Sequence, residues 1–268
     1  MTDSAGDGND LLDNAGGEGR GPAPGEASSD ARPDEAARRG AGGSPVRPLA
    51  EAFLVFAAFW LGAWLPADPS AVGAALVKPL YHLALAVDIL PKALLLLYLM
   101  HRLDSLASFG GVDRPRFADL SRAMTTAVGA ILVVGSAAAL ISLVQPGIKN
   151  PLLSSAGRPS ASPFALVPAV LLSSLAVGYA EELYFRVYLY RRLQQAGLTT
   201  FWAAAGTALL FASGHGLQGG LGIVLGLLIG SWFIWRRLRG ANLHELALGH
   251  AIYDAVVMLA SLYVHHSK

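Results

Sequence analysis

The chain has 268 residues, of which 53% are hydrophobic and only 15% charged, and its net charge is +1. Soluble domains usually carry about 25% charged residues, so this composition indicates a membrane protein. The absence of cysteine excludes disulfides, thiolate metal sites and cysteine nucleophiles, and no basic face of the kind that binds nucleic acid is present.

Residues 1–47 differ sharply from the rest of the chain. They carry nine acidic residues and five arginines among many Gly, Ala, Ser and Pro residues, with almost no large apolar side chains. Such a segment cannot bury enough apolar surface to offset the entropy of ordering. We therefore expect a disordered acidic tail, followed by one membrane domain over residues 48–268.

Seven apolar segments follow in this domain. A transmembrane helix needs about 20 apolar residues to cross the hydrocarbon core, or fewer where neighbouring helices shield it. The segments lie at residues 50–66, 80–101, 123–144, 163–190, 200–217, 220–236 and 243–264. We expect an all-α, polytopic membrane helix bundle with about seven transmembrane helices.

Basic residues fall unevenly between the two sides of such a bundle. Counting Lys and Arg on alternate sides gives fifteen on the side of the N-terminus and four on the other. By the positive-inside rule the N-terminus is cytoplasmic. Lys92 lies inside the second segment, one helical turn after Asp88, and we expect the two to pair.

The fourth segment carries charges at its end, in the stretch "YAEELYFRVYLYRR" (residues 179–192). Ionisable groups inside a bilayer are costly and usually mark function. Glu182 and Arg186 are four residues apart on one helix face and can form an ion pair. Glu181 is rotated by roughly 100° from Glu182, which leaves its carboxylate available for chemistry.

Two other segments carry polar groups at a similar depth. These are "FASGH" (residues 211–215) in the fifth segment and "HAIYD" (residues 250–254) in the seventh. At about 1.5 Å per residue, Glu181, His215 and His250 lie roughly 12 to 22 Å from the cytoplasmic surface. His250 and Asp254 are four apart, so Asp254 can orient the imidazole. We expect these groups to form one cluster.

A glutamate and a histidine in a dry pocket favour general-base activation of water, with His250 as donor to the developing oxyanion. The plainer interpretations are that His215 is a packing residue and that Glu182 and Arg186 serve only structure. "HELALGH" (residues 244–250) is not a zincin motif, because its histidines are six residues apart rather than four.

The ordered set "EELYFR", "FASGH" and "HAIYD" resembles the CPBP family, which includes the type II CAAX prenyl endopeptidases, bacteriocin-processing proteins and Abi proteins. The likeness covers about residues 163–260. It implies that Glu181 and His215 activate water, that His250 and Asp254 stabilise the oxyanion, and that Glu182, Arg186 and Phe211 support the motif.

The resemblance does not decide the role of Asp254 or whether the site binds a metal. The family more often has Asn where this chain has Asp254. An ionised Asp cannot donate a hydrogen bond to an oxyanion, so Asp254 orients His250, is protonated, or binds a metal. Glu181, His215, His250 and Asp254 would make an acceptable set of ligands for a divalent metal such as zinc. We expect no tightly bound metal.

The predicted function is an intramembrane endopeptidase of glutamic type in a bacterial inner membrane, cleaving a membrane-anchored protein or peptide. Sorting of C-terminal tails, as in the myxosortase-like branch, or maturation of peptides would fit. The alternatives are a non-catalytic scaffold or immunity protein, a proton-coupled transporter and a rhomboid-type serine protease using Ser213. The oligomeric state is not predicted.

Overall fold

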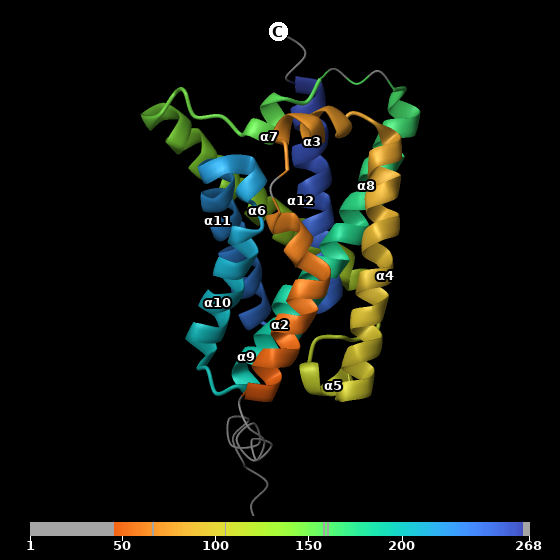
Figure 1. Ribbon diagram of the computed structural model, residues 1–268, viewed down its shortest axis with the longest axis vertical. Helices are drawn as coiled ribbons and strands as arrows, with labels where there is room; N and C mark the ends of the chain where they lie inside the picture. Colours follow the sequence, from red (N-terminus) through yellow and green to blue (C-terminus); the bar gives the residue numbers. More distant parts are fainter. Residues whose placement is uncertain (1–45, 66, 105, 158, 160, 265–268) are drawn as a thin grey trace, which may run out of the picture. The chain divides into compact units, whose positions relative to one another are not determined.

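A computed structural model describes residues 46–65, 67–104, 106–157, 159 and 161–264 (Figure 1). Residues 1–45 of the predicted tail lie outside these described residues. The described part contains helices and connecting segments and no β-strand, which confirms the all-α prediction. In chain order the elements are α2 (Val46–Trp60), η1 (Leu61–Trp64), α3 (Pro69–Ala75), α4 (Pro79–Leu103), α5 (Leu106–Phe109), α6 (Phe117–Val144), α7 (Pro151–Ser154), α8 (Pro163–Glu181), η2 (Glu182–Leu189), α9 (Tyr190–Gln195), α10 (Thr200–Ser213), η3 (Gly216–Gln218), α11 (Gly219–Leu238) and α12 (Leu243–Val264).

Five stretches are long and apolar enough to cross a membrane: Pro79–Leu103, Phe117–Val144, Pro163–Gln195, Gly216–Leu238 and Leu243–Leu262. The chain is therefore a multi-pass membrane protein. The other two predicted segments are also helical, but α2 has 15 residues and α10 has 14, fewer than the about 20 that a full crossing needs. Among the described residues, five of the seven predicted segments are therefore long enough to cross a membrane, and the other two form shorter helices.

The short length of α10 follows from the Gly-rich stretch after it. The helix ends at Ser213, and the chain turns through η3 to the start of α11 at Gly219. Gly219 has φ +73°, a left-handed conformation that glycine adopts without steric cost. The chain therefore reverses direction earlier than the predicted segment 200–217 implied.

Three helices begin with the same capping arrangement, a side-chain N-cap followed by proline. Asp68, Asn150 and Ser162 each accept hydrogen bonds from backbone N–H groups in the first turn of the next helix. Each is followed by proline at the first helical position, where the missing N–H has no cost. These caps fix the starting points of α3, α7 and α8.

Helix α8 packs between α4 and α12, and α12 in turn packs against α6. The approach to α12 is closest at Gly178, where a Cβ would lie 2.6 Å from the carbonyl oxygen of Ala247. On the other side, Ala86, Ile89 and Ala93 of α4 meet Ala176 and Ala180 of α8. Small residues on both faces of α8 thus bring three helices close together.

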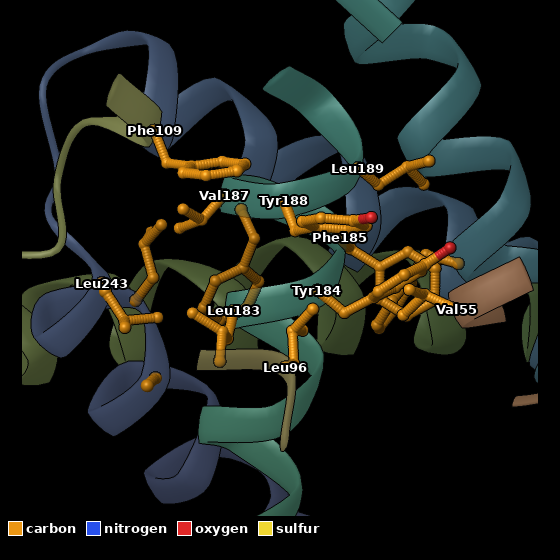
Figure 2. Close-up of a cluster of buried hydrophobic side chains, with 14 of the residues drawn as sticks. Val55, Leu96, Phe109, Leu183, Tyr184, Phe185, Val187, Tyr188, Leu189 and Leu243 are labelled. Carbon is orange, nitrogen blue, oxygen red and sulfur yellow. The ribbon is translucent and has the colours of Figure 1, made fainter. Parts of the chain in front are cut away.

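The main apolar core surrounds η2 (Figure 2). All eight residues of η2 are buried, including Tyr184 and Tyr188, which are 0% exposed. Their neighbours come from α2, α4, α5 and the start of α12, among them Val55, Leu96, Phe109 and Leu243. The segment that carries the charged motif is therefore the most enclosed part of the bundle.

Polar contacts tie the helix ends together on the side that carries most of the arginines. Arg237 at the end of α11 donates to the carbonyl of Gly110, and the N–H of Leu243 donates to the carbonyl of Gly111. Arg192 of α9 pairs with Asp104 at the end of α4. These contacts place the arginine-rich helix ends on one face of the bundle, as the alternating topology requires.

Candidate active site

The motif "EELYFR" does not lie on a regular α-helix. Residues Glu182–Leu189 form a π-helix that continues α8 without a break. Such segments are rare and frequently occur at functional sites. The wider turn begins immediately after Glu181, so it sets the directions of the side chains that follow. The i, i+4 spacing of Glu182 and Arg186 in the sequence gave no sign of this π-helical segment.

Glu182 and Arg186 form the buried ion pair that the sequence predicted. Arg186 Nε lies 3.2 Å from Glu182 Oε2, and the two side chains are 1% and 0% exposed. The guanidinium carbon lies 4.3 Å from the ring centroid of Phe211, with Phe185 and Phe233 within 6 Å of it. Aromatic faces partly compensate the burial of the cation, which explains how the charge is tolerated.

His250 of α12 is held by Glu182. Its Nδ1 lies 2.8 Å from Glu182 Oε1, and its side chain is 3% exposed. The carboxylate of Glu182, paired through its other oxygen with Arg186, is the acceptor of this contact, so Nδ1 of His250 carries the proton and donates. The ring also packs against Phe233 at a centroid distance of 5.0 Å. The tautomer and the orientation of His250 are thereby fixed.

The other nitrogen of His250 faces two further carboxylates. Nε2 lies 3.8 Å from Glu181 Oε2 and 3.6 Å from Asp254 Oδ1. Unlike Glu182, these carboxylates are partly open, with side-chain exposures of 20% and 31%. Glu181 and Asp254 are therefore the acidic groups of the cluster that a bound molecule can reach.

His215 stands at the end of α10, next to the same cluster. Its Nδ1 lies 3.1 Å from the carbonyl oxygen of Phe211, and the two rings are 4.8 Å apart between centroids. A carbonyl only accepts, so Nδ1 carries the proton and Nε2 of the neutral ring is an acceptor. The ring of Phe211 lies 5.9 Å from that of His250 and connects the two histidines.

The position of His215 depends on α11. A Cβ at Gly226 would lie 3.0 Å from Cγ of His215, and one at Gly230 would lie 3.1 Å from Cδ1 of Phe211. Gly226 and Gly230 of α11 thus leave space for the rings of His215 and Phe211. Neither Gly226 nor Phe233 carries a reactive group, so no sequence motif marks them as part of the site.

Glu181, Glu182 and Asp254 all lie around the ring of His250. Arg186 joins this cluster through Glu182, and Phe211 packs against both His250 and His215. Three roles were left open for Asp254, of which one was to orient His250. The hydrogen bond to Nδ1 of His250 comes from Glu182, while Asp254 Oδ1 lies 3.6 Å from Nε2, longer than a hydrogen bond.

The described residues contain no group of three or more His, Asp and Glu side chains arranged to hold a metal ion. Glu181, His215, His250 and Asp254 remain the predicted candidates for metal binding. The hydrogen bonds of the two histidines engage Nδ1 and leave Nε2 as the nitrogen that a ligand could reach.

His244 takes no part in the cluster. Its Nδ1 lies 2.9 Å from the hydroxyl of Tyr179 and its Nε2 lies 2.8 Å from the carbonyl oxygen of Asp113. Glu245 pairs with Arg236 instead of approaching either histidine. The stretch "HELALGH" is thus divided between a structural network and the candidate site, as its spacing indicated.

Comparison with known proteins supports the family resemblance that the three motifs indicated. Residues 163–256, about a third of its length, match the family model described as Type II CAAX prenyl endopeptidase Rce1-like. The matched region contains all three motifs, so the resemblance to the CPBP family inferred from them is confirmed. Neither curated proteins nor solved structures gave a match.

The fold and the family together define the class of protein. The described part of the chain is that of a multi-pass, all-helical membrane protein, and residues 163–256 are similar to the CAAX-type intramembrane proteases. Proteins of this class act on protein substrates at the bilayer, and the buried cluster of acids and histidines described above lies wholly inside the matched region.

Proposed function

We propose that the protein is an intramembrane endopeptidase in which Glu181 and His215 activate a water molecule for attack on a peptide bond. The observation that carries the proposal is that the two adjacent glutamates differ in exposure and in their partners. Glu182 is fully enclosed and engaged with Arg186 and His250, whereas Glu181 is partly open beside Nε2 of His250.

The tautomer of His215 supports this use of the site. A water that donates one hydrogen to the carboxylate of Glu181 and the other to Nε2 of His215 keeps its lone pairs free for attack. Both groups are acceptors in the protonation states that their partners favour. Burial among apolar side chains strengthens such an interaction and makes the carboxylate a better base. Glu181 takes the proton of the attacking water and returns it to the leaving amine.

His250 supplies the electrophilic side of the reaction. With Nδ1 fixed by Glu182, it donates a hydrogen bond from Nε2 to the oxyanion in its imidazolium form. The carboxylates of Glu181 and Asp254 face this nitrogen. Asp254 interacts with the imidazolium, or donates itself when protonated, so its role is close to that of an Asn at the same position.

The substrate class follows from where the cluster lies. Glu181 and His250 are on helices that cross the membrane, closer to the arginine-rich end of the bundle. Basic residues favour the cytoplasmic side, so the scissile bond belongs to a membrane-anchored protein or peptide near the cytoplasmic leaflet. A bacterial inner membrane, a cytoplasmic N-terminus and a role in sorting C-terminal tails or maturing peptides are parts of this proposal.

The test is replacement of Glu181 by Gln, which preserves shape and removes the base. Membrane proteins of a deletion strain are compared with those of strains carrying wild-type, Glu181→Gln or Ser213→Ala protein. We expect the same uncleaved precursor in the deletion and Glu181→Gln strains. Loss of cleavage should exceed about 100-fold, the lower range for a general base.

Ser213→Ala is the matched control. Ser213 lies two residues from His215, but its hydroxyl donates to the carbonyl of Leu210 within its own helix. We expect this variant to cleave normally, whereas a serine protease would lose activity. Normal cleavage by Glu181→Gln protein would refute the proposal and favour a scaffold, provided that both variants accumulate as folded protein.

A further inference from the structure

The arginine-rich end of the bundle holds two exposed guanidinium groups that no acid neutralises. Arg122 of α6 and Arg239 at the end of α11 are both exposed, and neither forms an ion pair within the described part of the chain. The exposed cation of α4 differs, because Lys92 Nζ lies 2.6 Å from Asp88 Oδ2, as the sequence predicted. The two unpaired arginines are a feature that the catalytic proposal does not use.

Both arginines lie on the faces with which α6 and α11 contact each other. Trp232 Nε1 of α11 donates to the carbonyl oxygen of Thr126 of α6 at 3.0 Å. Arg122 precedes Thr126 by about one turn on the same helix face, and Arg239 follows Trp232 by about two turns on the same face. Since α6 begins at this end of the bundle and α11 ends there, both arginines extend the contact in the same direction and face one another.

The nearest acids are already engaged. Asp119 of α6 accepts hydrogen bonds from the backbone N–H of Arg116 and from the side chain of Asn242, which follows α11. Glu245 pairs with Arg236. Both carboxylates are also buried. The two facing guanidinium groups therefore repel each other, and an anion that accepts hydrogen bonds from both would remove the repulsion.

The surroundings of the two arginines are those of a membrane–water interface. Trp232 and Trp235, whose rings are 5.0 Å apart, lie nearer the middle of the bundle than Arg239, and tryptophan is enriched at this level of a bilayer. The guanidinium carbon of Arg239 lies 5.6 Å from the ring centroid of Trp235. Trp235 and Leu238 are 43% and 45% exposed, so apolar surface that acyl chains can cover adjoins the cationic groups.

We propose that Arg122 and Arg239 bind the anionic headgroup of a phospholipid, whose acyl chains lie against α11 at Trp235 and Leu238. Guanidinium groups bind phosphate oxygens through paired hydrogen bonds, and basic pockets between helices at the membrane surface bind anionic headgroups. A soluble anion of the same charge would leave the apolar surface uncovered. The site uses none of the acids and histidines of the candidate active site, so the proposal does not rest on proteolysis.

The test is retention of phospholipid by the purified full-length chain in detergent micelles, measured by native mass spectrometry. Phosphatidylglycerol, which is anionic, and zwitterionic phosphatidylcholine are added at equal concentration. We expect wild-type protein to retain phosphatidylglycerol, and the double variant Arg122→Gln with Arg239→Gln to bind it at least about 10-fold more weakly. Arg102→Gln with Arg114→Gln is the matched control, because it removes two exposed arginines from α4 and from the segment before α6.

The same lipid should raise the unfolding temperature of the wild-type and control proteins and not that of the double variant. Arg122→Gln and Arg239→Gln each alter a single exposed side chain, and they serve the same comparison if the double variant does not accumulate. Equal loss of binding in the control would show attraction by net charge alone and would overturn the site, as would equal retention of phosphatidylcholine or unchanged binding by the variants. Stabilisation by inorganic phosphate as large as that by phosphatidylglycerol would overturn the assignment to a lipid.

Discussion

Nδ1 of His250 and the carboxylate of Glu182 meet at 2.8 Å with both side chains almost fully buried, and this contact joins α12 to η2. The second oxygen of the same carboxylate lies 3.2 Å from Arg186. One carboxylate thus holds both a cation and an imidazole. The adjacent glutamates have different surroundings, and that difference supports the proposed division into a structural role for Glu182 and a chemical role for Glu181.

The first prediction concerns this shared carboxylate. Glu182→Gln removes the negative charge while keeping the shape, which leaves Arg186 as a buried cation without a counterion. Breaking a buried pair in this way costs about 3–5 kcal/mol. We expect a lower unfolding temperature in detergent micelles and loss of cleavage, since the neutral amide of Gln no longer stabilises the imidazolium form of His250.

The double variant Glu182→Gln with Arg186→Met separates the two effects. Methionine fills a similar volume among Phe185, Phe211 and Phe233 without leaving a charge. Replacement of both partners is often far less costly than replacement of one, so the unfolding temperature should recover while cleavage does not. A double variant less stable than Glu182→Gln would show that the ion pair is not the source of the loss.

The second prediction uses the glycines of α11. Gly226→Ala would place a methyl group 3.0 Å from Cγ of His215, so the ring must shift. Small displacements of a catalytic group are costly in rate, and we expect kcat to fall about 10-fold or more with little change in KM. The measurement is steady-state cleavage of a substrate found by the comparison of strains.

Gly220→Ala is the control for that variant. It lies on the same helix, and a Cβ there would meet nothing within 4 Å. Both substitutions raise helix propensity equally, so a general effect on α11 would appear in both. Equal activity of the two variants would argue against a role for the position of His215.

The third prediction concerns Asp254. An Asn side chain at this position can donate a hydrogen bond to the oxyanion in every protonation state, whereas an ionised Asp cannot. We expect Asp254→Asn to retain activity within about 10-fold and to lose any pH dependence that Asp254 confers on kcat. Asp254→Leu should lose activity, because leucine can neither donate a hydrogen bond to the oxyanion nor interact with the imidazolium. If Asn proves as damaging as Leu, the carboxylate has a role that requires its charge.

The sequence was informative wherever chemistry and spacing coincide. The i, i+4 spacing of Glu182 and Arg186 predicted their ion pair, and the similar depths of the three motifs predicted a cluster. Hydropathy located all seven helices. These inferences rest on local periodicity and on the high cost of charge in a bilayer, which both act on each segment separately.

The features that could not be predicted from the sequence depend on contacts between segments. The π-helical turn of Glu182–Leu189 has no local signature, because aromatic residues packed against α2 and α5 stabilise it. The contact between Glu182 and His250 joins residues 68 positions apart in the chain, so the residue that orients the imidazole could not be chosen from local spacing alone. The 14-residue length of α10 likewise depends on how its Gly-rich turn packs on α11.

The last prediction concerns the arginine that joins α2 to the rest of the bundle. Arg192 of α9 lies 3.0 Å from Glu51 Oε2 of α2 and 2.8 Å from Asp104 Oδ2, and its side chain is 6% exposed. Its guanidinium also lies over the rings of Phe109 and Tyr188. Because α2 is too short to be anchored by a full crossing, these contacts should decide whether it stays docked.

Arg192→Met should therefore expose α2 and the face of η2 beneath it, and we expect faster limited proteolysis near residue 60 and a lower unfolding temperature. Arg47→Ala is the control, because Arg47 pairs with the same Glu51 but its side chain is 78% exposed. Exposed pairs contribute little, so this variant should behave as wild type. If removal of Arg47 is as damaging as removal of Arg192, the docking of α2 depends on charge near Glu51 in general and not on the buried guanidinium.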